Sequence, residues 1–103
     1  MSTFRFVDGP GDLPIAKIDN RFATAEISFY GAQVISFIPK GQKPVLWVSQ
    51  KSLYQYGKAI RGGIPVCWPW FGAHPLDKSQ PSHGYARIMA WPLIEALELP
   101  DGR

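Results

Sequence analysis

The sequence contains few of the residues that cross-link chains or bind metal ions, with one cysteine and two histidines among 103 residues. The single cysteine, Cys67, excludes an internal disulfide and is typical of a protein from a reducing compartment. Two histidines and one cysteine without close spacing do not make a zinc site. The sequence also lacks a Walker A loop and the glycine pattern of dinucleotide-binding folds. We therefore expect neither a metal ion nor a cofactor.

Long apolar runs are absent as well. No stretch reaches the length that spans a membrane, and the opening residues MSTFRFVD contain no signal-peptide core. We therefore expect a cytoplasmic protein without a membrane partner. The net charge of +3 favours an anionic small molecule as ligand and is too small to predict binding to nucleic acid.

Turn-forming residues, by contrast, are abundant. Ten glycines and ten prolines argue for many turns and against long helices. A chain of 103 residues forms at most one domain. With an apolar fraction of 46% it can bury one hydrophobic core.

The first half of the chain is predicted to form an antiparallel meander. Residues 22–29 alternate between apolar and polar faces, and 32–38 are rich in β-branched and aromatic residues, so both are expected to be strands. Residues 45–48 are continuously apolar, which predicts a short strand buried on both faces. Residues 15–19 alternate weakly and are interpreted as an edge strand, after a loop at 1–14. Turns are expected between these segments, at 20–21, 31 and 39–44.

The second half is predicted to be mostly irregular. Residues 49–57 are the best candidate for a short helical turn, with Ser49 or Ser52 as cap and Gly57 at its end. No regular element is expected from 58 to 81, a loop length that is usually functional or disordered. Strands are expected at 85–92 and 93–99, the latter against its helical propensity, and a turn at 101–103.

The richest chemistry lies in the stretch RGGIPVCWPWFG at 61–72 and its sequel PSHGYAR at 81–87. Here two arginines and a histidine stand among glycines, prolines and aromatics. The guanidinium of Arg61 or Arg87 fits a carboxylate or phosphate at two points, and aromatic faces stack on sugar rings. The glycines after Arg61 would let the backbone approach a ligand closely.

A structural interpretation has equal weight from the residues alone. Each arginine would then make a surface ion pair while the tryptophans fill the core. A lone histidine such as His83 is more often structural than functional, and Cys67 resembles a small buried hydrophobe more than a nucleophile. Acidic residues are scarce near the motif, so no His–carboxylate pair for acid–base catalysis can be assembled.

The segment AIRGGIPVCWPWFG, followed by PSHGYAR and then Trp91, resembles the glucose-6-phosphate 1-epimerases. These are hexose-6-phosphate mutarotases of the aldose 1-epimerase, or galactose mutarotase-like, superfamily. The segments GAQVISF and VLWVS are similar to early strands of that family, so the resemblance covers most of residues 20–95. It implies an all-β fold, a large antiparallel β-sandwich, with residues 1–103 as the N-terminal part of its single domain.

The resemblance also implies an activity, the interconversion of the α and β anomers of a hexose 6-phosphate without a cofactor. In that reaction a carboxylate takes the proton of the anomeric hydroxyl while a histidine protonates the ring oxygen. By position, Arg61 and Arg87 resemble substrate-binding arginines and are the expected partners of the phosphate. Ser82 would line the ligand, and His83 would orient sugar hydroxyls.

The chain departs from that family in length. Family members are much longer, and their acid histidine and base glutamate lie beyond the HGxAR pattern, so we expect no catalytic residue here. Unpaired strand edges would invite self-association or a completing chain. One alternative is a non-catalytic carbohydrate or sugar-phosphate binding module. Another, ranked last for its low charge and lack of a basic stripe, is a domain that stacks nucleobases on Trp68, Trp70 and Tyr85.

Overall fold

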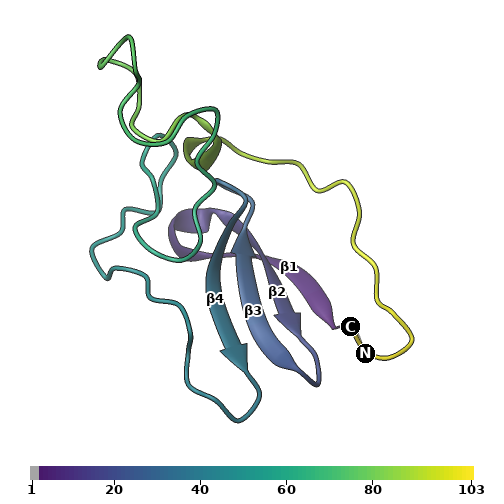
Figure 1. Ribbon diagram of the computed structural model, residues 1–103. Helices are drawn as coiled ribbons and strands as arrows, with labels where there is room; N and C mark the ends of the chain where they lie inside the picture. The colour runs from purple at the N-terminus through teal and green to yellow at the C-terminus, as the bar shows by residue number, and fades with distance from the viewer. Residues whose placement is uncertain (1–2) are drawn as a thin grey trace.

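The computed structural model describes residues 3–103 and shows a four-stranded sheet with a long irregular segment extending from it (Figure 1). The strands pair antiparallel in sequence order, so the all-β prediction is confirmed, and the predicted strands at 22–29 and 32–38 are found as β3 and β4. The elements are β1 (Phe4–Asp8), the 3-10 turn η1 (Pro10–Asp12), β2 (Pro14–Asp19), β3 (Ala23–Ser28), β4 (Gln33–Pro39) and the 3-10 turn η2 (Ala86–Ile88).

The turns between the strands form for the expected reasons. The Asn20 side-chain oxygen accepts hydrogen bonds from the backbone N–H groups of Phe22, at 2.9 Å, and Ala23, at 3.1 Å, as Asn does in turns. Gly31, between β3 and β4, has φ +81°. Gln42 N–H donates to the Pro39 carbonyl to close the turn after β4. The predictions at 20–21, 31 and 39–44 are therefore confirmed.

The two faces of the sheet differ as the alternation of β3 predicts. Thr24 and Glu26 line a polar face, whereas Ile27 and Phe29 line an apolar face. β4 carries a bulge, because Glu26 pairs with Ser36 while the next residue, Ile27, pairs with Val34. A bulge leaves one residue of β4 unpaired and bends the strand.

The core is small and lies at the end of the sheet nearest the irregular segment. Leu13, Tyr30 and Ile60 form its buried centre. Ser28 and Gln33 are also fully buried. Four partly buried side chains pack around the centre: Ile35, Val48, Tyr54 and Ile88.

The N-terminal prediction is wrong, because residues 1–14 were expected to be a loop and contain β1. Its register against β2 places Phe4 opposite Ile18 and Val7 opposite Ile15. The charged residues of β1 mask this apolar pairing in the sequence. β2 is confirmed as a strand, but it lies between β1 and β3 rather than at the edge of the sheet.

The buried strand expected at 45–48 is also wrong. Val45 is 62% exposed and Trp47 is 72% exposed. Only Val48 pairs, in an isolated bridge to Gly62. A longer ladder cannot form there because Gly62 has φ +124°, outside the range of a regular strand.

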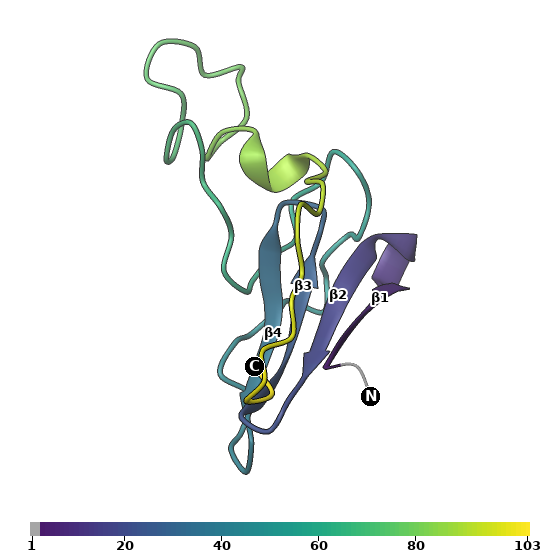
Figure 2. The ribbon, with the colours of Figure 1, turned by 90° about the vertical axis from the view of Figure 1, so that its right-hand side faces the viewer.

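Three further expectations for the second half need correction. Residues 49–57 form separate turns instead of a helical turn, and the Ser49 hydroxyl accepts from Lys51 N–H within the first of them. Residues 85–92 contain η2 and one isolated bridge, Tyr30 to Ala90, rather than a strand. Residues 93–99 are extended but unpaired among the described residues, and run along the sheet (Figure 2). An extended segment becomes a strand only where a neighbour pairs with it.

The irregular stretch 58–81 is confirmed, since only isolated bridges occur in it. Its distal part rises away from the sheet in both views (Figures 1 and 2), and the molecule measures 48 × 29 × 24 Å. The turn expected at 101–103 is present, with Gly102 N–H bound to the Leu99 carbonyl. Residues 3–103 include no helix with the length and hydropathy needed to cross a membrane.

Burial of Tyr30 leads to a prediction about alkaline stability. Its side chain is 1% exposed, and its hydroxyl makes no hydrogen bond of normal geometry. Burial raises its pKa above the usual value, and the nearby backbone of Gly57 and Lys58 offsets only part of this. Below about pH 10 the phenol is neutral in both states, and above it the unfolded state ionises first. Stability is therefore lost as pH rises through this range.

We expect Tyr30→Phe to remove part of this loss, because phenylalanine does not ionise. At neutral pH the change should alter stability by less than about 1 kcal/mol, since the hydroxyl makes no hydrogen bond of normal geometry. Urea unfolding of both proteins at about pH 8 and about pH 11 measures the difference. Equal alkaline loss in the two proteins would refute it, and Tyr85→Phe, at an exposed tyrosine that packs on Trp70 rather than on Tyr30, is the control.

Candidate functional site

Arg61 has a fixed backbone and an exposed side chain. The Ser52 hydroxyl accepts from Arg61 N–H at 3.0 Å and donates to the Arg61 carbonyl at 3.3 Å. Ser49 N–H donates to the same carbonyl at 2.7 Å. No ion pair within residues 3–103 involves the Arg61 guanidinium. The chain thus fixes the backbone at Arg61 and leaves the exposed guanidinium without a carboxylate partner among residues 3–103.

The two glycines after Arg61 lie where their backbone passes very close to other backbone segments. Gly62 has φ +124°, and a Cβ there would lie 2.2 Å from the Trp47 carbonyl oxygen. Gly63 has φ +66°, and its Cβ would lie 2.2 Å from the Val34 carbonyl oxygen. The close approach expected toward a ligand is therefore made here to the chain's own backbone.

The loop that carries the remaining motif is closed at its base. The Trp68 carbonyl accepts from Tyr85 N–H at 2.9 Å and from Ala86 N–H at 3.1 Å. Gly84 has φ +79°, and a Cβ there would lie 2.1 Å from the same oxygen. Loops with adjoining ends and internal contacts are ordered and frequently functional.

His83 joins the two sides of this loop a second time, through hydrogen bonds to Gly72. Its N–H donates to the Gly72 carbonyl at 2.8 Å, and its ring Nδ1 accepts from Gly72 N–H at 2.9 Å. In the neutral ring Nε2 then carries the hydrogen, which leaves it as the donor for any further partner. The ring also packs edge to face on Phe71, with 4.7 Å between centroids.

Arg87 lies in η2, close to Ser82 and His83. Its Nη2 donates to the Ser82 carbonyl at 3.0 Å, while the Ser82 side chain is exposed. The Nε of Arg87 is buried and has no hydrogen-bond partner. The structure therefore brings Ser82, His83 and Arg87 together on one loop, and Arg61 lies on a separate segment.

The aromatic residues of the motif have two uses. Trp70 packs edge to face on His74 and Tyr85, and its ring N–H donates to the Pro81 carbonyl at 2.9 Å. Trp68 and Phe71 are 68% and 81% exposed. Trp70 and its partners hold the loop closed, whereas Trp68 and Phe71 present aromatic faces that could stack on a sugar ring.

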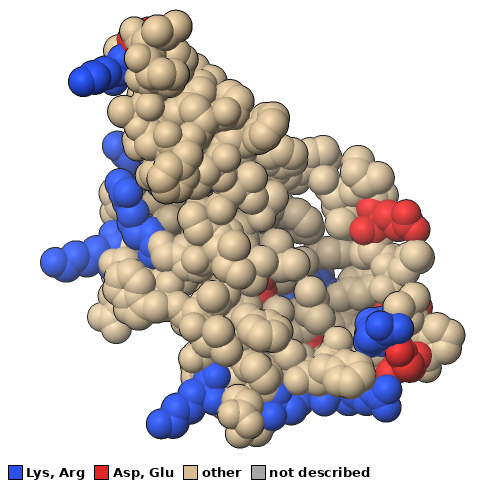
Figure 3. Space-filling model, viewed as in Figure 1, with Lys and Arg blue, Asp and Glu red and all other residues tan. Residues whose placement is uncertain are grey.

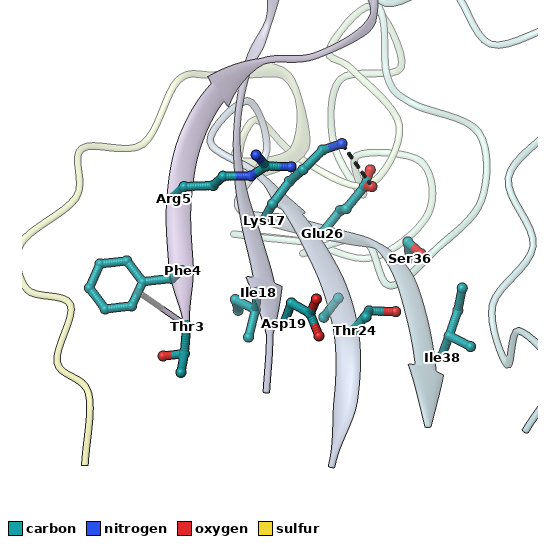
Figure 4. Close-up of a pocket in the computed structure, with 11 residues that line it drawn as sticks. Thr3, Phe4, Arg5, Lys17, Ile18, Asp19, Thr24, Glu26, Ser36 and Ile38 are labelled. Carbon is teal, nitrogen blue, oxygen red and sulfur yellow. Dashed lines mark ion pairs between the residues drawn. The ribbon is translucent and has the colours of Figure 1, made fainter. Parts of the chain in front are cut away.

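Two cavities lie against the sheet. One, of about 540 Å³, lies on the polar face, where Arg5, Lys17, Glu26 and Ser36 form a row across the four strands (Figure 4). Lys17 and Glu26 pair at 3.8 Å within it. The other, of about 340 Å³, lies between the apolar face and residues 93–97. None of the four predicted site residues lines either cavity.

Basic and acidic groups are dispersed. On the face shown in Figure 3, Lys and Arg side chains are spread around the outline rather than gathered in one stripe. Residues 3–103 contain no cluster of three or more His, Cys, Asp or Glu side chains that could hold a metal ion. The pKa of the exposed Asp77 carboxyl is lowered by hydrogen bonds from the hydroxyl and N–H of Ser79 and the Gln80 side chain.

Sequence reasoning missed the residues that hold the two arginine segments. Gln33 and Ser52 bind the Arg61 segment from elsewhere in the chain, and Tyr30 pairs with Ala90, three residues after Arg87. The one available signal is a polar glutamine among the apolar residues of a predicted strand, directly after the turn at Gly31.

Comparison with known proteins gives consistent results. Residues 14–102 match the aldose 1-epimerase family. The "Putative glucose-6-phosphate 1-epimerase" of Escherichia coli K12 is 40% identical over 91 residues, or 88% of this chain, and the protein of the same name from Salmonella typhimurium LT2 is equally similar. The chain spans about a third of the length of these relatives, 31% in each.

A solved structure extends the likeness to the fold. The crystal structure of a "putative mutarotase", YeaD, from Salmonella typhimurium superposes with a TM-score of 0.83 at 38% identity. The match covers 90% of this chain and 31% of the other. The predicted galactose mutarotase-like fold is therefore confirmed, with one antiparallel sheet of it among residues 3–103.

Proposed function

This chain belongs to the aldose 1-epimerase family, and on that premise we propose that it forms part of a pocket for a hexose 6-phosphate. The reaction of such a pocket interconverts the α and β anomers of the sugar. The relatives carry the name of a glucose-6-phosphate 1-epimerase, so glucose 6-phosphate is the substrate to test first. Arg61, Ser82, His83 and Arg87 are the proposed binding residues.

One observation carries this proposal: Arg61 and Arg87, two of the four arginines without a carboxylate partner among residues 3–103, lie in the motif that also carries the exposed aromatic faces. Arg61 is fixed through its backbone, and Arg87 through its bond to the Ser82 carbonyl. Arginines without a carboxylate partner are suited to a phosphate, which can accept two parallel hydrogen bonds from one guanidinium fork. Trp68 and Phe71 add exposed faces for the sugar ring.

Each group has a proposed role in binding. The arginines take the phosphate charge, so the sugar is held at its C6 end and its anomeric carbon is free to react. His83 donates through Nε2 to a sugar hydroxyl, because its Nδ1 already accepts from Gly72. Ser82 offers its exposed hydroxyl beside Arg87. No cofactor is needed for a reaction that consists of proton transfers and a bond rotation.

We assign no catalytic acid or base to this chain. Among residues 3–103, no hydrogen bond or ion pair joins an Asp or Glu to the four site residues. The chain spans about a third of its relatives' length, and we propose that the acid and base belong to sequence equivalent to the remainder. In this proposal residues 1–103 are the N-terminal part of a single β-sandwich domain that acts in the cytoplasm.

The exposed apolar side chains favour a completing polypeptide as partner. Trp47, Trp68 and Leu76 are 72%, 68% and 92% exposed. Within residues 3–103 the outer edge of β1 has no strand beside it, and that of β4 has only isolated contacts with Val45 and Ile64. Such edges and apolar faces are costly in water and pair with other strands. A second copy of the chain is the alternative partner. Sedimentation with and without a β-rich complementing polypeptide distinguishes self-association from binding of that polypeptide.

We predict that the chain alone does not accelerate anomerisation. Equilibration of freshly dissolved α-glucose 6-phosphate, followed by polarimetry, should proceed within about twofold of the uncatalysed rate, because proton transfer needs a positioned acid and base. Saturable binding with no turnover would fit the binding half of the site. It would also fit the alternative of a non-catalytic sugar-phosphate module, which predicts no turnover after complementation either. Turnover by the pure chain at an enzymatic rate would contradict our assignment.

A further inference from the structure

We propose that residues 30–33 set the positions of Arg61 and Arg87 relative to each other; this turn consists of the last three residues before β4 and of Gln33, the first residue of β4. Gln33 and Gly31 are its positioning residues. This inference rests on the proposed function, since it concerns the same two arginines. Nothing in it requires the turn to touch the ligand.

Gln33 holds the Arg61 segment from both sides of the arginine. Its side-chain amide donates to the Gly62 carbonyl at 2.6 Å and to the Ile60 carbonyl at 3.3 Å. The residue is fully buried; its bond to Ile60 is buried and its bond to Gly62 is partly buried, so losing the donors would leave carbonyl groups without a partner away from water. A buried amide that binds the carbonyls before and after Arg61 fixes the backbone from which its side chain projects.

The start of β4 extends this attachment. Ile64 N–H donates to the Val34 carbonyl at 2.9 Å, and Gly63 passes so close to that carbonyl that only a glycine fits. The segment from Ile60 to Ile64 is therefore anchored to the residues that directly follow the turn.

Gly31 holds the Arg87 segment from the other side of the same turn. Its N–H donates to the Met89 carbonyl at 2.8 Å. A Cβ at Gly31 would lie 2.9 Å from the Arg87 carbonyl oxygen and 3.3 Å from its carbonyl carbon, so the absence of a side chain lets η2 pack here. Tyr30 adds an isolated bridge to Ala90.

The two arginine segments thus meet on four consecutive residues of one turn. No hydrogen bond among residues 3–103 joins Arg61 directly to Arg87. Their spacing therefore depends on contacts made through other residues, and residues 30–33 contact both segments through Gly31 and Gln33. Binding sites need their groups within about 0.5 Å of the productive arrangement, so a shift of either segment should weaken a ligand that requires both.

The test compares two turn variants with matched controls. Gln33→Met keeps the length of the side chain and removes its donors, and Gly31→Ala adds the Cβ that meets Arg87. The controls are Gln42→Met, at an exposed glutamine, and Gly41→Ala, at φ +74° with nothing within 4 Å. The affinities for glucose 6-phosphate and for glucose are measured with each, together with the thermal midpoint.

We expect each turn variant to lose about tenfold in affinity for glucose 6-phosphate, the scale on which sub-ångström misplacement acts. Affinity for glucose should stay within about twofold, and both controls should match the parent chain for both ligands. Gln33→Asn, which keeps the amide donors on a shorter side chain, should recover part of the loss. An equal loss for both ligands, or no loss in folded variants, overturns the inference.

NMR signals of the arginine side chains make the test independent of folding yield. In the parent chain the Nε–H signals of Arg61 and Arg87 should move together on addition of glucose 6-phosphate. In folded Gln33→Met the Arg61 signal should respond more weakly than the Arg87 signal, and an unchanged joint response overturns the inference. If the parent signals do not respond, or if Arg61→Ala and Arg87→Ala bind like the parent, the proposed function itself fails. If those arginine variants lose affinity while the turn variants do not, only the present inference fails.

Discussion

Replacing Arg61 or Arg87 by alanine is expected to weaken binding of glucose 6-phosphate by about 10- to 100-fold. A hydrogen bond between charged partners contributes about 1.5–3 kcal/mol, and 1.4 kcal/mol corresponds to a factor of ten. Binding of unphosphorylated glucose should change by less than about threefold, since the arginines are assigned to the phosphate. Isothermal titration with both ligands measures the two effects.

A matched control is available at the opposite end of the sheet. Arg21 lies in the turn between β2 and β3, where its guanidinium packs over the Phe22 ring at 4.7 Å from the centroid. Arg21→Ala removes the same charge from the chain and should leave binding of both ligands unchanged. If glucose and glucose 6-phosphate lose equally in the Arg61 and Arg87 variants, the phosphate assignment is wrong. If Arg21→Ala has the same effect, only net charge matters.

The largest expected loss of stability comes from Gly62→Ala. The new Cβ would lie 2.2 Å from the Trp47 carbonyl oxygen and 2.6 Å from the Val48 Cα, at φ +124°. A disallowed backbone conformation costs about 1–3 kcal/mol, and displacing two backbone atoms adds to it. We expect a loss of about 3 kcal/mol or more, against a total of about 5–15 kcal/mol for typical domains.

Gly41→Ala measures the loss of stability that a positive φ causes by itself, without a steric clash. Gly41 also has positive φ, at +74°, but nothing lies within 4 Å of its Cβ position. This variant should lose only about 1 kcal/mol, the conformational part. The difference between the two variants in urea unfolding reports the contact with Trp47. Equal losses would mean that the Gly62 segment does not pack against residues 47–48 as described.

The sequence predicts the part of the fold that local pattern determines. β3, β4 and their turns follow from alternation, β-branched residues and turn chemistry, and all are found. β1 was missed because Arg5 and Asp8 interrupt its apolar pattern. Residues 45–48 and 93–99 have strand-like sequences, but strands need a continuous partner. Residues 45–48 make only an isolated bridge at Val48, and residues 93–99 have no paired strand within residues 3–103.

The candidate site was predictable only in its chemistry. The arginines, His83 and the aromatics stand out in the sequence because of their types and their glycine and proline neighbours. Their supports do not, because Gln33 lies 27 residues before the carbonyl of Ile60 that it binds. A contact over that distance is set by packing, which composition and periodicity do not encode. The same holds for Gly31 and the Arg87 carbonyl.

The most direct test of the central claim is a titration of the chain with glucose 6-phosphate, followed through the side-chain Nε–H signals of Arg61 and Arg87. If both guanidinium groups bind one anionic sugar, both signals move along a single binding curve, and glucose at the same concentrations moves neither as far. If only one signal moves, or the two follow different dissociation constants, the arginines do not share a ligand.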